Sequence, residues 1–272
     1  MQQYTVLRQE FVQALSSRYD EGEAKAMFRI LQQDLGQSAN LEDELNSLLP
    51  QLLTGRPFQY VLGKASFFGM DLYVNEAVLI PRPETEELVD RIVKSRLSNT
   101  PRIIDIGTGS GCIALALKKA IPEAEVYAMD VSGEALEVAR KNANSLGLEI
   151  NFIQADILEW EFVVDSDLRF DLVVSNPPYI TPGEKLEMES HVLDFEPDLA
   201  LFVPEESPLL FYQHIADFAR NHLFPYGKLY FEINQKYGRD IQDLLLKKGF
   251  KDVRIVQDMQ GADRMIEAEQ IK

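Results

Sequence analysis

The chain has 272 residues, of which 46% are hydrophobic, and this length suits one large domain or two modest ones. Its formal net charge is −17, which repels phosphate backbones and disfavours a nucleic acid as the direct partner. One cysteine excludes an internal disulfide framework, and no apolar run approaches transmembrane length, so we expect a cytoplasmic protein that does not enter a membrane.

Residues 1–55 are expected to form a small helical domain. Apolar residues recur at helical spacing in three stretches, and Gly36, Pro50 and Gly55 are expected to break or end the helices. Nothing in this domain has the pattern of a catalytic site. The apolar faces contain Leu7, Phe11, Ala14 and Leu15, then Ala24, Phe28 and Leu31, and finally Leu41, Leu45, Leu48 and Leu52.

Residues 56–80 are expected to form a β-hairpin that links the helical domain to the rest of the chain. Aromatic and β-branched residues gather around Gly63 and Gly69, and the bend is predicted at residues 69–71. Beyond the hairpin, Pro83 lies among acidic residues, which is typical of the first turn of a helix.

Residues 81–272 are expected to form an α/β domain. After Pro101, predicted strands alternate with predicted helices, which implies right-handed βαβ units and a mainly parallel sheet. The last two strands have a connection too short for a parallel crossover, so they should form an antiparallel hairpin. The predicted strands are residues 102–106, 125–129, 150–153, 171–174, 228–233, 251–257 and 264–268, and the predicted helices are residues 112–120, 132–145, 208–223 and 238–248.

A glycine-rich loop, Gly107-Thr108-Gly109-Ser110-Gly111, joins the first of these strands to its helix. Alternating glycines let the backbone approach a ligand closely. The spacing is not the dinucleotide-binding Gly-x-Gly-x-x-Gly, and the Lys-Ser/Thr of a P-loop is missing. The loop resembles motif I of class I S-adenosylmethionine methyltransferases, which implies that Asp105 orients the loop or reaches the methionine ammonium through a water.

Acidic residues follow the next two predicted strands. Asp130 ends the second strand, where one carboxylate can accept hydrogen bonds from both hydroxyls of a ribose. We favour this role over capping of the next helix, which Ser132 can provide. After the third strand, Asp156 can accept from an adenine amino group and Ile157 can pack on the ring, but a solvated loop Asp beside a core Ile explains the pair equally well.

The strand predicted at residues 171–174 leads into Asn176-Pro177-Pro178-Tyr179. Each proline fixes φ and lacks an N–H, so the segment forms a stiff turn at a strand's carboxyl end, where open α/β sheets bind ligands. The Asn176 side-chain oxygen and the Pro177 carbonyl can accept both hydrogens of a planar –NH2 group, while Tyr179 stacks on its face. The turn is expected to hold an amide or an exocyclic amine; the alternative is a proline-rich turn that only ends a strand.

Short motifs, each modest alone, occur in one order along the chain. They are RPFQYVLG at residues 56–63, FFG at 67–69, VLIPRPETE at 78–86, DIGTGSGCIA at 105–114, DVS at 130–132, VSNPPYI at 174–180, EP at 196–197 with AL at 200–201, and GADR at 261–264. With these motifs the chain resembles the protein-glutamine methyltransferases of peptide chain release factors, the HemK/PrmC family, over essentially its whole length.

This resemblance implies a substrate-recognising helical domain, a linking hairpin and a seven-stranded, Rossmann-like methyltransferase domain. It implies N5-methylation of the glutamine in a Gly-Gly-Gln motif of release factors, with S-adenosyl-L-methionine converted to S-adenosyl-L-homocysteine. Residues 176–179 would bind the glutamine, and the loop at 107–111 with Asp130 would bind the cofactor. Asn234, Ile157 and residues 203–207 depart from the family pattern, which puts fine contacts in doubt but not the reaction class.

Two other functions stay open as alternatives. A DNA or RNA exocyclic-amine methyltransferase would use the same turn, because the turn suits any –NH2 group, although the acidic balance disfavours nucleic acid. A non-catalytic S-adenosylmethionine-binding module would be expected to lose Asn176 or the glycines, and both are intact. No metal is expected, because His191, His214 and His222 lack metal-ligand spacing.

Overall fold

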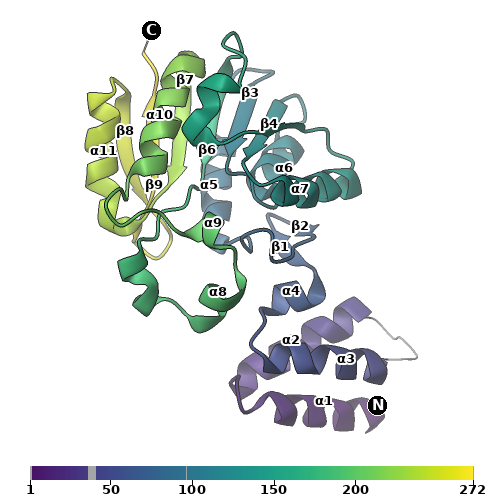
Figure 1. Ribbon diagram of the computed structural model, residues 1–272. Helices are drawn as coiled ribbons and strands as arrows, with labels where there is room; N and C mark the ends of the chain where they lie inside the picture. The colour runs from purple at the N-terminus through teal and green to yellow at the C-terminus, as the bar shows by residue number, and fades with distance from the viewer. Residues whose placement is uncertain (1, 36–40, 96, 272) are drawn as a thin grey trace. The chain divides into compact units, whose positions relative to one another are not determined.

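The computed structural model describes residues 2–35, 41–95 and 97–271 (Figure 1). The chain divides into two compact units, one made of residues up to 64 with residues 189–195, and the other of residues 65–188 with residues from 196 onward. The domain limits expected from the sequence, at residues 55 and 80, stay predictions.

The first unit is helical. Its buried core confirms the apolar faces that the sequence predicts, with Phe11, Leu15, Phe28 and Leu31 among the buried residues. The helix break expected at Pro50 is wrong. Pro50 lies inside α3, in its last turn, where proline removes only one backbone hydrogen bond and burial of neighbouring leucines offsets this loss. Gly36 lies outside the described residues. The helices are α1 (Gln2–Leu15), α2 (Glu21–Leu35), α3 (Leu41–Leu53), α4 (Phe58–Leu62) and α8 (Ser190–Phe195).

The predicted hairpin is present but shorter than expected. Strands β1 (Ala65–Phe67) and β2 (Met70–Leu72) pair in antiparallel fashion, and the bend lies at Phe68 and Gly69 rather than at residues 69–71. Residues 58–62 form α4 instead of a strand, which the aromatic content of this segment did not reveal. The helix starts after Pro57 and ends at Gly63, whose φ of 64° suits glycine.

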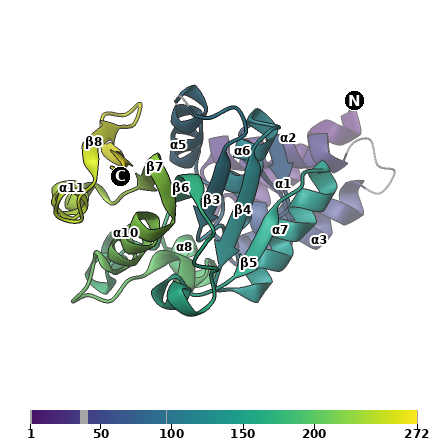
Figure 2. The ribbon, with the colours of Figure 1, turned by 90° about the horizontal axis from the view of Figure 1, so that it is seen from above.

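The second unit contains a seven-stranded sheet in the order β5-β4-β3-β6-β7-β9-β8 (Figure 2). The pairs from β5 to β7 are parallel, while β9 pairs antiparallel to both β7 and β8, as expected from the short connection. The strands are β3 (Arg102–Ile106), β4 (Glu125–Asp130), β5 (Asn151–Gln154), β6 (Phe170–Ser175), β7 (Leu223–Glu232), β8 (Lys251–Gln257) and β9 (Asp263–Glu269).

Helices cover both faces of this sheet because the buried strands are apolar on both sides. On β3, Ile103 packs in the core that contains α5 and α6 residues, and Ile104 packs in the core that contains α10 and α11 residues. No helix among the described residues is long and apolar enough to cross a membrane. The helices and 3₁₀ turns are α5 (Pro83–Lys94), α6 (Cys112–Ala120), α7 (Gly133–Leu146), η1 (Ile157–Phe162), η2 (Pro182–Glu187), α9 (Asp198–Leu201), α10 (Leu210–His222), η3 (Gln235–Tyr237) and α11 (Gly238–Lys247).

The strand order places a ligand site at one edge of the sheet. The chain runs outward from β3 through β4 to β5 and then returns to β6, on the other side of β3. In open α/β sheets, ligands bind outside the carboxyl ends of the strands where the order reverses in this way. The carboxyl ends of β3 and β6 meet at this point.

Candidate active site

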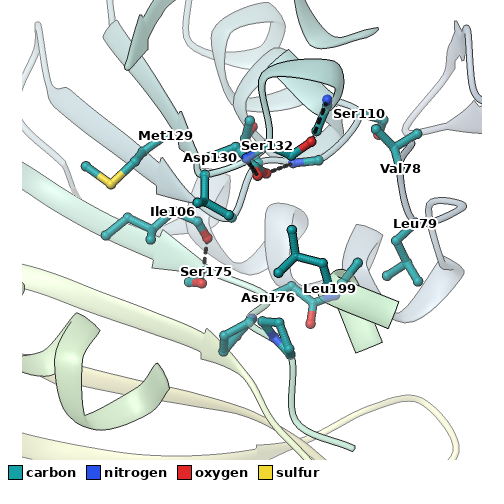
Figure 3. A pocket seen from close by; sticks show the side chains of 18 of the residues that line it. Val78, Leu79, Ile106, Ser110, Met129, Asp130, Ser132, Ser175, Asn176 and Leu199 are labelled. Carbon is teal, nitrogen blue, oxygen red and sulfur yellow. Dashed lines mark hydrogen bonds between the residues drawn. The ribbon is translucent and has the colours of Figure 1, made fainter. Parts of the chain in front are cut away.

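A cavity of about 310 Å³ lies at the carboxyl ends of β3, β4 and β6 (Figure 3). All predicted site residues line it except Asp105, Gly111 and Tyr179. The lining residues that were predicted are Gly107, Thr108, Gly109, Ser110, Asp130, Asp156, Ile157, Asn176, Pro177 and Pro178. The sequence motifs are therefore brought together in one pocket.

The glycine loop forms one wall of this cavity. The amides of Gly107 and Thr108 both donate to the Met129 carbonyl, at 2.8 and 3.0 Å, which ties the loop to the end of β4. Gly109 has a φ of 54°, and a Cβ atom there would have no heavy atom within 4 Å, so its α-carbon is open to a ligand. Gly111 differs, because a Cβ atom there would approach Ala139 of α7 at 3.2 Å, and its role is close helix packing.

Asp105 supports the loop from below. It is fully buried, and its Oδ2 accepts from the Thr108 hydroxyl at 2.6 Å and from the Ala114 amide at 3.3 Å. Its Oδ1 is buried without a hydrogen-bond partner among the described residues. Burial raises the pKa of this carboxyl to about 7. Of the two roles implied by the resemblance, orientation of the loop fits this geometry directly.

Asp130 faces the cavity from the end of β4. Its Oδ2 accepts from the Gly109 amide at 2.9 Å and its Oδ1 accepts from the Ser132 amide at 3.0 Å (Figure 3). Ser132, and not Asp130, caps α7, since its hydroxyl accepts from the Ala135 amide at 3.1 Å. Burial raises the pKa of Asp130, and the backbone hydrogen bonds lower it. Each carboxylate oxygen keeps a second lone pair, as a bound diol requires.

Asp156 and Ile157 lie side by side at the start of η1. The Asp156 Oδ1 accepts from the Leu158 amide at 2.8 Å and caps this short helix. Ile157 is only 8% exposed, belongs to the core and still lines the cavity. Both residues therefore line the cavity, and their contacts with an adenine remain a prediction.

Residues 176–178 of the turn form the opposite wall. The Ser175 hydroxyl donates to the Ile106 carbonyl at 2.6 Å, which fixes the end of β6 against β3 (Figure 3). The Asn176 Nδ2 donates to the Thr85 hydroxyl at 3.4 Å, and this hydroxyl donates to the Glu232 Oε2 at 2.6 Å. Thr85 and Glu232 were not predicted as site residues. For Glu232 the sequence contains a signal, an acidic residue at the carboxyl end of an apolar strand.

Tyr179 does not line the cavity. It packs against the hydrophobic core as a partly buried residue. Burial raises the pKa of Tyr179. Stacking of its ring on a substrate amide therefore stays a prediction, and in this structure the residue contributes to the support of the turn.

Long-range contacts hold the chain on both sides of the turn. The Asn234 side chain donates to the Tyr179 carbonyl at 3.3 Å and to Glu184 at 3.1 Å, which gives this departure from the family pattern a structural role. Arg82 forms an ion pair of 2.6 Å with Glu196, whose side chain is fully buried. Glu196 also accepts from the Ile80 amide at 3.2 Å, so it joins the segment before α5 to the segment before α9.

The cavity lining combines acidic residues with much apolar surface. The acidic residues are Glu76, Asp130, Glu134 and Asp156, alongside the basic Arg82, and the apolar wall includes Val78, Leu79, Met129, Leu199, Phe211 and Ile215. Such a pocket suits a ligand with hydroxyl, amino or ammonium groups on an apolar body.

Comparison with known proteins places the chain among methyltransferases. A family model described as "Methyltransferase small domain" matches residues 84–193. The release factor glutamine methyltransferase of Flavobacterium psychrophilum is 46% identical over 95% of this chain and 96% of its own, and that of Bacteroides thetaiotaomicron is 48% identical over 86% and 84%. A methyltransferase structure from Pyrococcus furiosus shares the fold, with a TM-score of 0.57 and 22% identity over 76% of this chain and 92% of its own.

Proposed function

Because the chain belongs to the release factor glutamine methyltransferase family, we propose that it methylates the side-chain amide nitrogen of a glutamine, in the Gly-Gly-Gln motif of a peptide chain release factor. The observation that carries this proposal is the cavity that unites the glycine loop and Asp130 with the Asn176–Pro177 turn. One wall can hold the methyl donor, and the other can hold an amide.

The cofactor fits the first wall. Gly107 and Gly109 offer a backbone surface without obstructing side chains, Asp130 offers two oxygens for a ribose, and Ile157 offers an apolar surface for a base. When bound, S-adenosyl-L-methionine supplies a methyl group on a sulfonium, which is a reactive electrophile. The acidic residues of the cavity also favour a cationic ligand over a neutral one.

The turn would hold and orient the glutamine. An amide nitrogen is a weak nucleophile, because its lone pair is delocalised into the carbonyl. If the Asn176 Oδ1 and the Pro177 carbonyl accept the two amide hydrogens, the nitrogen is held in one orientation and electron density is pushed toward it. Positive charge that develops on the nitrogen strengthens both hydrogen bonds, so these acceptors stabilise the transition state more than the ground state. Positioning alone can lower the barrier by up to about 7–11 kcal/mol.

A methyl-transfer assay tests the proposed reaction. The full-length protein is incubated with S-adenosylmethionine and a release factor, and the glutamine-containing peptide is analysed by mass spectrometry. We expect one added methyl group on the glutamine of the Gly-Gly-Gln motif. Double-stranded DNA and structured RNA serve as parallel substrates, and methylation of either one without methylation of the factor would replace this proposal with an exocyclic-amine methyltransferase.

We further propose that the helical unit recognises the release factor rather than taking part in chemistry. Among the described residues, its core contains only residues before residue 64, and none before Glu76 lines the cavity. Removal of residues 1–64 should therefore leave cofactor binding largely intact and raise the KM for the whole factor. Comparison of kcat/KM for whole factor and for a short Gly-Gly-Gln peptide checks this role. Equal loss with both substrates would make the unit a stability element instead.

A further inference from the structure

Two buried residues behind the turn have no role in the proposed reaction so far. Thr85 lies in the first turn of α5 and Glu232 is the last residue of β7, and each is 2% exposed. Thr85 lines the cavity, and its hydroxyl lies between two partners, the Glu232 Oε2 at 2.6 Å and the Asn176 Nδ2 at 3.4 Å. The three side chains thus form one hydrogen-bonded chain that ends at the residue expected to hold the substrate.

The chemistry of a hydroxyl fixes the direction of this chain. A threonine hydroxyl has a single hydrogen, and here that hydrogen is donated to the carboxylate of Glu232. Toward Asn176 the same oxygen can only accept, so the atom of Asn176 that faces it must be the NH2 nitrogen. A reversed carboxamide would place two acceptors together without a hydrogen between them. The carboxamide oxygen is therefore turned away from Thr85.

We infer that Thr85 and Glu232 are positioning residues that hold the Asn176 carboxamide with its oxygen free to accept a hydrogen from the substrate amide. The inference rests on the proposed function of the Asn176 turn and adds two residues to it. Neither residue touches the reacting atoms; each acts through Asn176. Their contribution follows from the orientation of one amide group, because only its oxygen can accept from an –NH2 group.

Protonation of Glu232 would undo this arrangement. Burial raises the pKa of this carboxyl to about 7. The Thr85 hydrogen bond, Arg264 on β9 and the Tyr179 hydroxyl favour the charged form and limit this rise, whereas the negative charge of Glu84 on α5 adds to it. Tyr212 of α10 donates its hydroxyl to the Glu232 backbone carbonyl, and the negative charge of Glu232 contributes to the raised pKa of the Cys112 thiol on α6. A protonated Glu232 can donate to Thr85, and Thr85 can then donate to the Asn176 oxygen.

The predicted pH dependence follows from this reversal. Once the Asn176 oxygen faces Thr85, the NH2 group faces the cavity, and it cannot accept a hydrogen from the substrate. Turnover should therefore be high above pH 7 and should fall as pH drops through about 7, where Glu232 becomes protonated. Because the pKa of Asp105 is also raised to about 7, the comparison of the wild type with E232Q, and not the wild-type profile alone, assigns the decline to Glu232.

The test compares kcat for T85V, T85S and E232Q with the wild type, on a release factor at saturating cofactor. T85V keeps the shape of the side chain but removes the hydroxyl, and we expect kcat to fall about 10- to 100-fold with cofactor affinity changed less than about twofold. T85S keeps the hydroxyl and should restore most of the rate. E232Q should lower kcat at pH 8 and remove the decline of kcat below pH 7.

A matched control is Y212F, which removes another buried hydroxyl bonded to Glu232 but leaves the Thr85 chain intact. Y212F should keep kcat within about twofold of the wild type, since Tyr212 is not part of the hydrogen-bonded chain from Glu232 through Thr85 to Asn176, which we call the relay. A T85V enzyme with wild-type kcat, or an E232Q enzyme that keeps the wild-type pH profile, would overturn the inference. If T85V does not fold, the pH profiles of wild type and E232Q decide alone.

A readout without activity separates this inference from the proposed function. The NH2 resonances of the Asn176 side chain should shift with pH near 7 in the wild type and stay constant in E232Q. If the wild type methylates no release factor but shows this shift, the proposed function fails and the relay stands. If the wild type is active and the resonances do not respond to pH or to T85V, the relay is wrong and the function stands.

Discussion

The two walls of the cavity are supported in different ways. On the wall that contains the glycine loop, which we propose binds the cofactor and call the cofactor wall, the supporting hydrogen bonds are local: Thr108 donates to Asp105 three residues away, and Gly109 donates to Asp130 over 21 residues. On the wall that contains Asn176, which we propose binds the glutamine and call the substrate wall, they span the domain, with Asn176 bonded to Thr85 over 91 residues and Thr85 to Glu232 over 147. The cofactor wall is thus a property of one βαβ unit, whereas the substrate wall exists only when α5, β6 and β7 have packed together.

This difference predicts which substitutions should impair the function of each wall. Changes in the glycine loop should affect cofactor binding directly, because loop and support are the same short segment. Changes far from the turn should affect turnover, because the orientation of Asn176 depends on distant elements. The largest effects are expected where a substitution enters the cavity itself.

Gly109→Val should abolish cofactor binding. The new side chain would project into the open cavity, at a φ of 54° that a β-branched residue adopts only with strain. Isothermal titration calorimetry should detect no binding of S-adenosylmethionine, while circular dichroism shows a folded protein. If this variant bound S-adenosylmethionine with wild-type affinity, the glycine loop would not be part of the cofactor site, and the proposed difference between the two walls would be wrong.

Asn176→Ala should show most clearly that the two walls have different functions. It removes an acceptor that is most useful in the transition state, so kcat should fall about 10²- to 10³-fold. Cofactor affinity should change little, because the cofactor wall keeps its own support. Steady-state kinetics combined with calorimetry measures both effects, and near-normal turnover would show that the turn is only structural.

Asp130→Ala should weaken cofactor binding without abolishing it. The loss of hydrogen bonds to a charged group is expected to cost about 1.5–3 kcal/mol. Asp130 also holds the Gly109 amide, so part of this cost comes from a looser loop. Calorimetry gives the affinity, and kcat at saturating cofactor should remain near that of the wild type. A large fall in that kcat would mean that the two walls are coupled.

Each wall also contains one buried carboxyl, Asp105 or Glu232, whose pKa is raised to about 7. Because these pKa values lie above those of the unfolded chain, both groups favour folding at low pH and lose this contribution as pH rises through about 7. The free energy of unfolding of E232Q, relative to the wild type, should increase by about 1–2 kcal/mol between pH 5.5 and 7.5. Denaturant unfolding at these two pH values measures it, and a difference that does not vary with pH would contradict the raised pKa.

The same contrast explains what could be predicted from sequence. Strands β3 and β8 and helix α6 match the predicted bounds, because periodicity and glycine punctuation are local signals. The start of β7 was missed, since Pro225 and Gly227 interrupt its pattern. The cofactor loop and Asp130 were placed correctly at the sheet edge by their motifs.

The support of the turn could not be predicted in this way. Thr85 and Glu232 are 147 residues apart, and no local pattern links them. Tyr179 belongs to a motif that suggests a direct contact with substrate, which stays a prediction, while in the folded chain the residue packs against the core and is not among the lining residues of the cavity. Tertiary contacts decide these positions, and only the folded chain contains them.

The composition of the helical unit has a consequence for synthesis of the protein on the ribosome. This unit includes α8, from a segment that lies some 130 residues after the end of α4. At typical elongation rates of 5–20 residues per second, about 7–25 s separate the appearance of these two segments. The core of the helical unit, which consists of residues before residue 64, can therefore form early, whereas α8 can join the unit only after much of the sheet domain has been made. The final assembly of the helical unit would be among the late events of co-translational folding.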